Sequence, residues 1–258
     1  MKSYICIFAL LLTSSLASNS FAQLDFGIAE GEIEEAVDES PWSGSFAAGL
    51  NGKTGNSENI DINVSLNVAR ETEVGKTALL ANYFFSSNDV STVTDRLFGQ
   101  ARHERTLANP RWSGFAQAQY EWDRFKTFDF RLGLHGGLTF EVFKQDDRFL
   151  KVRLGGGASR EFGDDALDLE WIPELQFGGD WERQVNENVK LFASTDYFPN
   201  VTDFADYRLV TNAGLEVVLD AVRDVNFRVF ALHRYDSTPV AGDQETDLDY
   251  GMAISVGF

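Results

Sequence analysis

The sequence is short of cysteine and of basic residues, and each shortage excludes a class of protein. Cys6 is the only cysteine among 258 residues, which excludes disulfide-rich scaffolds and cysteine-based metal sites. Lys and Arg number 22 against 40 Asp and Glu, so the formal net charge is -18. This balance argues against nucleic-acid binding, because phosphate backbones are held by clustered Lys and Arg.

The sequence also has no apolar run as long as the roughly 20 residues that a transmembrane helix requires. Its mean hydropathy of -0.22 would ordinarily indicate a soluble protein. Membrane β-barrels are the exception, because lipid-facing apolar residues alternate with polar residues that face the lumen.

The first 22 residues have the pattern of a secretory signal peptide. Lys2 precedes a short apolar core, and Ser20 and Ala22 supply small residues at the positions that a signal peptidase reads. We therefore expect export with cleavage after Ala22, the alternative being an N-terminal membrane anchor. Cys6 lies within the apolar core, which argues against a lipid anchor on it.

Residues 23–41 are acidic, and we interpret them as a solvated periplasmic leader. Closely spaced like charges oppose an isolated helix, although Ile28, Ile33 and Val37 could mark one face of a short plug or docking helix. This alternative remains open from the sequence.

From residue 42 to residue 258 the hydrophobic pattern has period two, which is typical of strands. Apolar residues alternate with polar ones through 60–69, and again from Phe128 to His135 and from Arg208 to Leu219. Turn-forming residues separate these runs at 53–57, 71–76, 86–91, 107–110, 123–126, 144–148, 160–166, 184–188, 199–206, 220–224 and 237–246. Eleven connections predict about twelve strands in an all-β, antiparallel, up-and-down transmembrane β-barrel.

Tryptophan placement supports a membrane-spanning wall. Trp112 and Trp122 lie ten positions apart on one face of a predicted strand, and Trp171 and Trp181 repeat the spacing. Ten tilted residues rise roughly 25 Å, the height of the apolar band between two aromatic girdles. A soluble sandwich core would not explain aromatics at strand ends. The chain ends in an outward-alternating strand at Phe258, which resembles the assembly signal of bacterial outer-membrane proteins.

The start of the predicted barrel carries a family resemblance. Trp42, Gly44 and Gly49 precede a turn with the sequence Thr-Gly-Asn-Ser-Glu at 54–58. This segment resembles the YdiY-like family of putative salt-induced outer-membrane proteins. The resemblance implies an outer-membrane barrel of unsettled role and supplies no catalytic residues.

The polar parity of the strands predicts the lumen. Its acids and arginines are roughly balanced, which favours a narrow or partly blocked interior over a wide pore. The lumen-lining candidates are Glu121, Asp129, Arg131, Arg153, Glu174, Arg208, Glu216 and Arg228.

Enzymatic and metal chemistry find weak support. Outer-membrane phospholipases, which share the strand number, resemble serine hydrolases with a Ser two residues from a His on one strand, a spacing absent here. A triad assembled across strands remains open. Asp243, Glu245, Asp247 and Asp249 alternate near the last loop and could hold Ca²⁺ or Mg²⁺, although a solvated acidic loop is the simpler interpretation. We predict no enzyme activity, no cofactor and no metal.

We therefore expect a monomeric protein of the cell outer membrane that acts as a narrow passive channel or an envelope-structural protein. The expected partners are outer-membrane lipids, lipopolysaccharide and the barrel assembly machinery, with no nucleic acid. The alternatives are a surface-binding module that acts through acidic extracellular loops and a lipid-modifying enzyme.

Overall fold

The protein is a closed antiparallel β-barrel of twelve strands in the described residues of the computed structural model, which are 41–53, 59–88, 91–126, 128–163, 170–239 and 244–258. The strands are β1 (Trp42–Lys53), β2 (Asn59–Thr72), β3 (Gly75–Asn88), β4 (Thr92–Thr106), β5 (Trp112–Asp123), β6 (Phe130–Gln145), β7 (Arg148–Phe162), β8 (Ile172–Asn186), β9 (Val189–Pro199), β10 (Tyr207–Asp220), β11 (Val225–Asp236) and β12 (Thr246–Gly257). The predicted signal peptide and, apart from residue 41, the predicted leader lie outside the described residues.

Each strand pairs with its neighbours in the chain, and β12 closes the ring on β1. The prediction of an all-β, up-and-down barrel with about twelve strands is therefore confirmed. The structure has no helix in its described part that is long and apolar enough to cross a membrane.

The two ends of the barrel differ. At one end of the barrel, β1 begins and β12 ends. The same end has five turns of two to five residues, at 73–74, 107–111, 146–147, 187–188 and 221–224. We call this the short-turn end. At the opposite, long-loop end the connections reach nine residues, at 163–171 and 237–245.

The wall has mostly polar residues inside and mostly apolar residues outside, the reverse of a soluble barrel. On β2 the buried side chains are Asn63, Ser65 and Asn67, whereas Leu66 between them is 41% exposed. On β6, His135 is buried, and the neighbouring Leu134 is 46% exposed. The period-two pattern therefore sorts these residues between the lumen and the outer surface.

Aromatic side chains lie toward the two ends of the outward face. Trp112 pairs with Phe140 near the short-turn end, their rings 4.8 Å apart. Near the long-loop end, rings lie beside one another across strands in two rows. The rings of Tyr120, Phe130 and Phe162 are stacked, and those of Tyr197, Tyr207 and Tyr235 are tilted against one another. Of the four predicted girdle residues, Trp112 and Trp181 lie toward the short-turn end and Trp122 and Trp171 toward the long-loop end.

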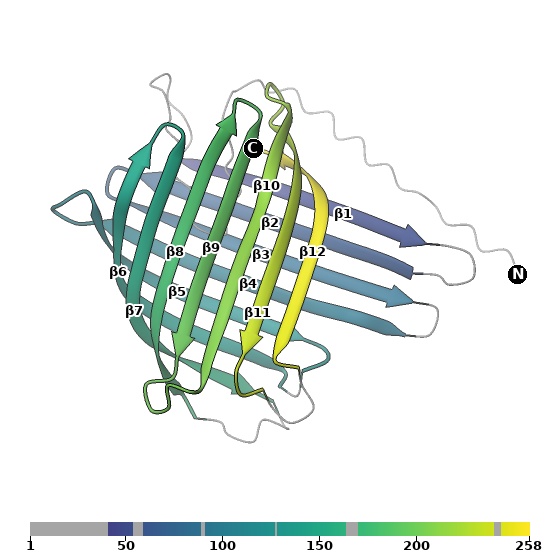
Figure 1. The fold of residues 1–258 in the computed structure, drawn as a ribbon, viewed down its shortest axis with the longest axis vertical. Helices are drawn as coiled ribbons and strands as arrows, with labels where there is room; N and C mark the ends of the chain where they lie inside the picture. Colours follow the sequence, from purple (N-terminus) through teal and green to yellow (C-terminus); the bar gives the residue numbers. More distant parts are fainter. Residues whose placement is uncertain (1–40, 54–58, 89–90, 127, 164–169, 240–243) are drawn as a thin grey trace, which may run out of the picture.

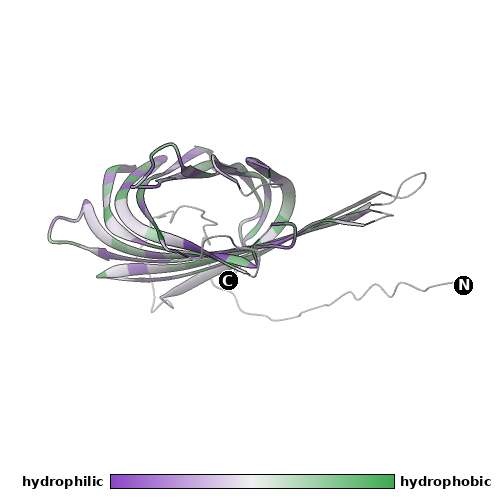
Figure 2. Cartoon of the chain, turned by 90° about the horizontal axis from the view of Figure 1, so that it is seen from below, coloured by the Kyte–Doolittle hydropathy of each residue, from purple (hydrophilic) through white to green (hydrophobic). Residues whose placement is uncertain are grey.

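The junction between β1 and β12 is the shortest in the wall. Four residue pairs join them, from Ser45 with Gly257 to Ala48 with Ile254. A Cβ atom on Gly49 would lie 2.2 Å from the Met252 carbonyl oxygen, so β12 passes close to β1 where the pairing stops. Figure 1 shows the first strands, purple to blue, extending beyond the ring that the later strands complete, and Figure 2 shows the same extension from below.

The outward apolar face gives a direct prediction. On β6, Leu134 lies between the aromatic residues Phe130 and Phe140 of the two ends, and its sheet partners are Ala118 of β5 and Ala158 of β7. We expect Leu134→Arg to lower the free energy of unfolding in lipid by about 2–4 kcal/mol, the range for a cation at the bilayer midplane. Denaturant titration in phospholipid vesicles measures this. Val222→Arg, in an exposed short turn, is the control, and equal effects of the two changes would contradict an outward face in contact with lipid.

Candidate functional site

The lumen holds most of the predicted candidates. Glu121, Arg131, Arg153, Glu174, Arg208, Glu216 and Arg228 all lie on the inward side of their strands, and Arg153, Glu174, Glu216 and Arg228 are buried. Asp129 differs, because it precedes β6 and is exposed at the long-loop rim. The neighbouring Phe128, expected on the outward face, is instead buried, with the Arg131 guanidinium 4.9 Å from its ring.

Arg102 and Arg153 form the centre of a buried cluster of charges. Arg153 pairs with Asp180 and lies 3.2 Å from Asp196. Arg102 lies 3.7 Å from both carboxylates, and its Nε donates to Gln117 at 2.7 Å. We call Arg102, Arg153, Asp180 and Asp196, with the nearby Lys151–Glu104 pair at 2.6 Å, the central cluster.

Three cations and three carboxylates balance in the central cluster, and all six side chains are at most 9% exposed. Removing one partner from such a cluster leaves an uncompensated buried charge, which is strongly destabilising. Room for the cluster depends on Gly178, where a Cβ atom would lie 2.1 Å from Asp196 Oδ1.

A second cluster, the mouth cluster, lies near the long-loop end. Arg131 of β6 pairs with Glu161, lies 3.6 Å from Glu121 and donates to Asp236 of β11 at 3.0 Å. Because β6 and β11 are not neighbours in the ring, the last pair crosses the lumen.

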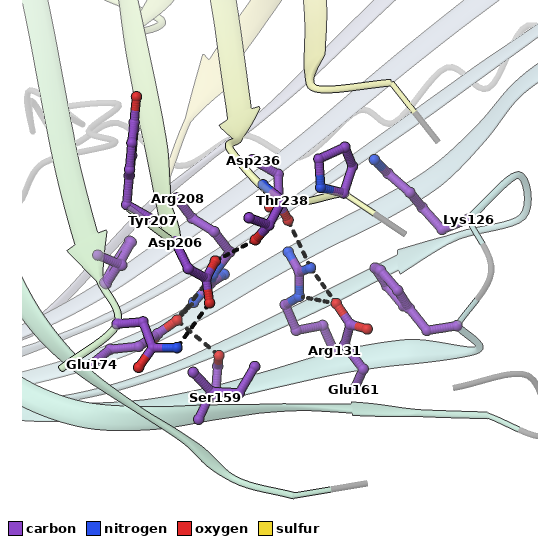
Figure 3. A pocket seen from close by; sticks show the side chains of 15 residues that line it. Lys126, Arg131, Ser159, Glu161, Glu174, Asp206, Tyr207, Arg208, Asp236 and Thr238 are labelled. Carbon is purple, nitrogen blue, oxygen red and sulfur yellow. Dashed lines mark hydrogen bonds and ion pairs between the residues drawn. The ribbon is translucent and has the colours of Figure 1, made fainter. Parts of the chain in front are cut away.

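Glu174 joins the other side of the mouth cluster. It accepts hydrogen bonds from Arg208 at 2.8 Å and from Ser159 at 2.9 Å, and it lies 3.0 Å from His135 Nε2. Figure 3 shows Arg131, Glu161, Glu174 and Arg208 around one cavity of about 120 Å³. Ser159 and His135 both contact Glu174, whereas a hydrolytic triad needs the base to contact the nucleophile.

A third cluster ties β12 to strands across the ring. Arg96 of β4 lies 3.4 Å from Asp247 and 3.5 Å from Asp249 of β12. Lys126 approaches Asp247 to 3.1 Å, and Arg234 donates to Asp249 at 2.8 Å. Of the four acids considered as cation ligands, Asp247 and Asp249 thus face protein cations, Glu245 is exposed, and Asp243 lies outside the described residues. Within the described ranges, no group of three or more His, Cys, Asp or Glu side chains could hold a metal ion.

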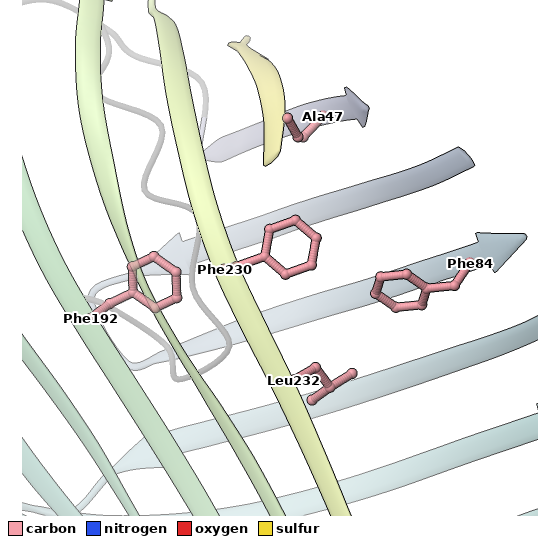
Figure 4. Close-up of a cluster of buried hydrophobic side chains, with 6 residues drawn as sticks. Ala47, Phe84, Phe192, Phe230 and Leu232 are labelled. Atoms are coloured by element: carbon pink, nitrogen blue, oxygen red, sulfur yellow. The ribbon is translucent and has the colours of Figure 1, made fainter. Parts of the chain in front are cut away.

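An apolar cluster also occupies part of the lumen. Its buried members are Ala47, Phe84, Phe192, Phe230, Leu232 and Ala253 (Figure 4). The rings of Phe84 on β3 and Phe230 on β11 lie 6.1 Å apart, and Leu232 has no exposed surface. Sequence reasoning missed this cluster, because alternation predicts polar residues on the inward face. The consecutive apolar residues at 83–85 and 229–232 are the signal that could have found it.

Comparison with known protein families identifies the family of this chain. Residues 46–258 match the model of DUF481, described as a protein family of unknown function. The chain belongs to this family. None of the curated proteins matches the DUF481 chain.

Three solved structures are similar to this DUF481 member. The NanC porin aligns over 83% of this chain and 97% of its own, with a TM-score of 0.46 and 11% identity. The translocator domain of autotransporter NalP from Neisseria meningitidis aligns over 84% and 86%, with a TM-score of 0.38 and 15% identity. CdiB from Acinetobacter baumannii aligns over 84% and 48%, with a TM-score of 0.32 and 11% identity. The strand order of this chain by itself shows a closed antiparallel barrel.

The central cluster yields a stability prediction. Arg153→Ala leaves Asp180 and Asp196 buried with one cation fewer, so we expect the free energy of unfolding to fall by about 3–5 kcal/mol. Urea titration monitored by circular dichroism measures the change.

The control for this experiment is Arg223→Ala, which removes an arginine that is 80% exposed and paired with Asp220 in a short turn. We expect no measurable change there, because exposed ion pairs contribute little. A similar small effect at Arg153 would show that water reaches the central cluster.

Proposed function

We propose that the protein is an envelope-structural barrel of the cell outer membrane whose lumen is closed at rest. The apolar outward face and its aromatic ends support membrane insertion, since they match a lipid-facing band between two interfaces. The proposal also includes export by a signal peptide that is cleaved after Ala22, assembly by the barrel machinery and a monomeric state. It agrees with the resemblance to the YdiY-like group.

The observation that carries the closed state is the packing of the lumen. Arg102, Asn82, Gln176, Asn212 and Leu232 are each less than 2% exposed although they face inward from different strands. A water-filled pore would leave such side chains in contact with water. The apolar cluster adds a second barrier, because ions are poorly solvated beside phenylalanine rings.

A narrow passive channel is the second candidate, and the mouth cavity favours it. The side chains of Arg131 and Arg208 are 14% and 13% exposed, so solvent reaches the outer part of the lumen. Conduction would require the cross-lumen contacts below this cavity to separate. We propose no enzymatic role, because the hydroxyl and imidazole groups of the mouth cluster both contact a carboxylate.

Single-channel conductance in a planar bilayer tests this proposal. We expect the wild-type protein to insert and remain silent. We expect Phe84→Ala/Phe230→Ala to produce conductance steps, because the change removes the two rings that meet across the lumen. Phe177→Ala is the matched control and should stay silent, because Phe177 lies on the outward face and is 43% exposed.

The same recordings distinguish the two candidates. Reproducible steps from the wild-type protein that Arg131→Gln alters would reject the closed barrel and support the narrow channel. Failure to insert into bilayers would reject both.

A further inference from the structure

The short-turn rim places two arginines in an unfavourable arrangement. Arg148 of β7 and Arg183 of β8 are Cα partners in the sheet, and both are exposed. They share the outward parity of Leu150 and Trp181, the next outward pair along the same two strands. Directly opposed like charges destabilise a sheet, because their Cβ atoms are only about 4.5–5.5 Å apart. An anion between the two side chains would remove this repulsion.

The groups around the two arginines leave positive charge available. Arg148 Nε donates to Gln145 Oε1 at 2.5 Å, and its contact with Asp147, which is itself 62% exposed, is 4.0 Å long. Arg183 has no ion pair with any residue that the structure describes. The remaining acids of the adjoining turns, Asp146 and Glu187, are exposed, as are the neighbouring cations Arg105, Arg111 and Lys144.

The position relative to the aromatic residues indicates which anion would meet this pair. The Arg148 guanidinium lies 5.6 Å from the ring of Phe143, and Trp181 precedes Arg183 by two residues on the same face. Aromatic girdles lie at the level of the lipid headgroups. Two guanidinium groups just beyond such a girdle are at the level of lipid phosphates, and arginine binds phosphate oxygens with paired hydrogen bonds.

The opposite rim lacks this character. Its exposed described charges are mostly acids, Asp129, Glu170, Asp203 and Glu245, with Arg124 as the exposed cation. The two rims therefore differ in their exposed described charges: cations outnumber acids at the short-turn end, where Glu71 and Glu73 are also exposed, and acids outnumber cations at the long-loop end.

We propose that Arg148 and Arg183 form a binding site for the phosphate of an anionic glycerophospholipid in the leaflet at the short-turn end. The site anchors the barrel at a fixed depth, with the phosphate between the two guanidinium groups and the acyl chains along the apolar outward face of β7 and β8. This inference rests on the proposed membrane location, since a soluble protein would not present the pair to lipid.

The test compares thermal unfolding of the inserted protein in phosphatidylglycerol and in phosphatidylcholine vesicles. A ligand that binds only the folded state raises the unfolding temperature. We expect the wild-type protein to unfold at a higher temperature in phosphatidylglycerol, and Arg148→Gln/Arg183→Gln to lose more than half of that difference. Arg223→Gln, which removes an exposed cation from another short turn, should keep it.

Each other outcome has a defined meaning. An undiminished difference in the double variant would overturn the proposal. An equal stabilisation of detergent-solubilised wild-type protein by inorganic phosphate alone would also overturn it in favour of a site for free phosphate. Insertion is measured first, through the heat-dependent mobility of the protein on gels. This separates failure to insert from failure to bind lipid.

Discussion

Charges enclosed by the barrel wall have to neutralise one another, because the closed sheet separates them from bulk water. The central cluster satisfies this condition with three cations and three carboxylates that are at most 9% exposed. Isolated ions in such surroundings would cost several kcal/mol each. A charged side chain inside the wall is therefore stable only with its partners, and a substitution at one residue affects side chains on several strands.

The same pairs connect strands that the backbone leaves apart. Arg131 links β6 to β11, and Arg96 links β4 to β12. The second link matters because β12 pairs with β1 over a short stretch only. Side chains thus hold the long-loop half of the ring together where backbone hydrogen bonds between β1 and β12 are few. The apolar contact between Phe84 and Phe230 joins β3 to β11 across the lumen, on either side of the β1–β12 junction.

Much of the wall was predictable from the sequence, because period-two alternation and turn residues are local signals. All eleven connections fall at the predicted turns, and Trp112 and Trp122 lie near opposite ends of one strand. The inward side of Arg153 or Glu216 follows from parity alone. Their ion-pair partners do not follow from parity. Arg153 of β7 pairs with Asp196 of β9, which is two strands away in the sheet.

Other features depended on tertiary structure. Phe230 lies at an inward position that parity assigns to polar residues, and only the facing Phe84 explains it. Phe128 continues the outward parity of Phe130 but precedes the strand, so the loop turns its ring inward beneath Arg131. The sequence has no cysteine after Cys6, so a single thiol can be introduced at a chosen position of the barrel without a competing one there.

A closed lumen is the central claim, and thiol accessibility tests it most directly. In a Cys6→Ser background, Ser65→Cys places one thiol at a buried inward position, and Ser91→Cys places one at the exposed rim. The account predicts that a charged, membrane-impermeant maleimide labels residue 91 rapidly and residue 65 only after unfolding. Comparable labelling of both thiols in the folded, inserted protein would contradict it, because water and ions would then reach the middle of the lumen.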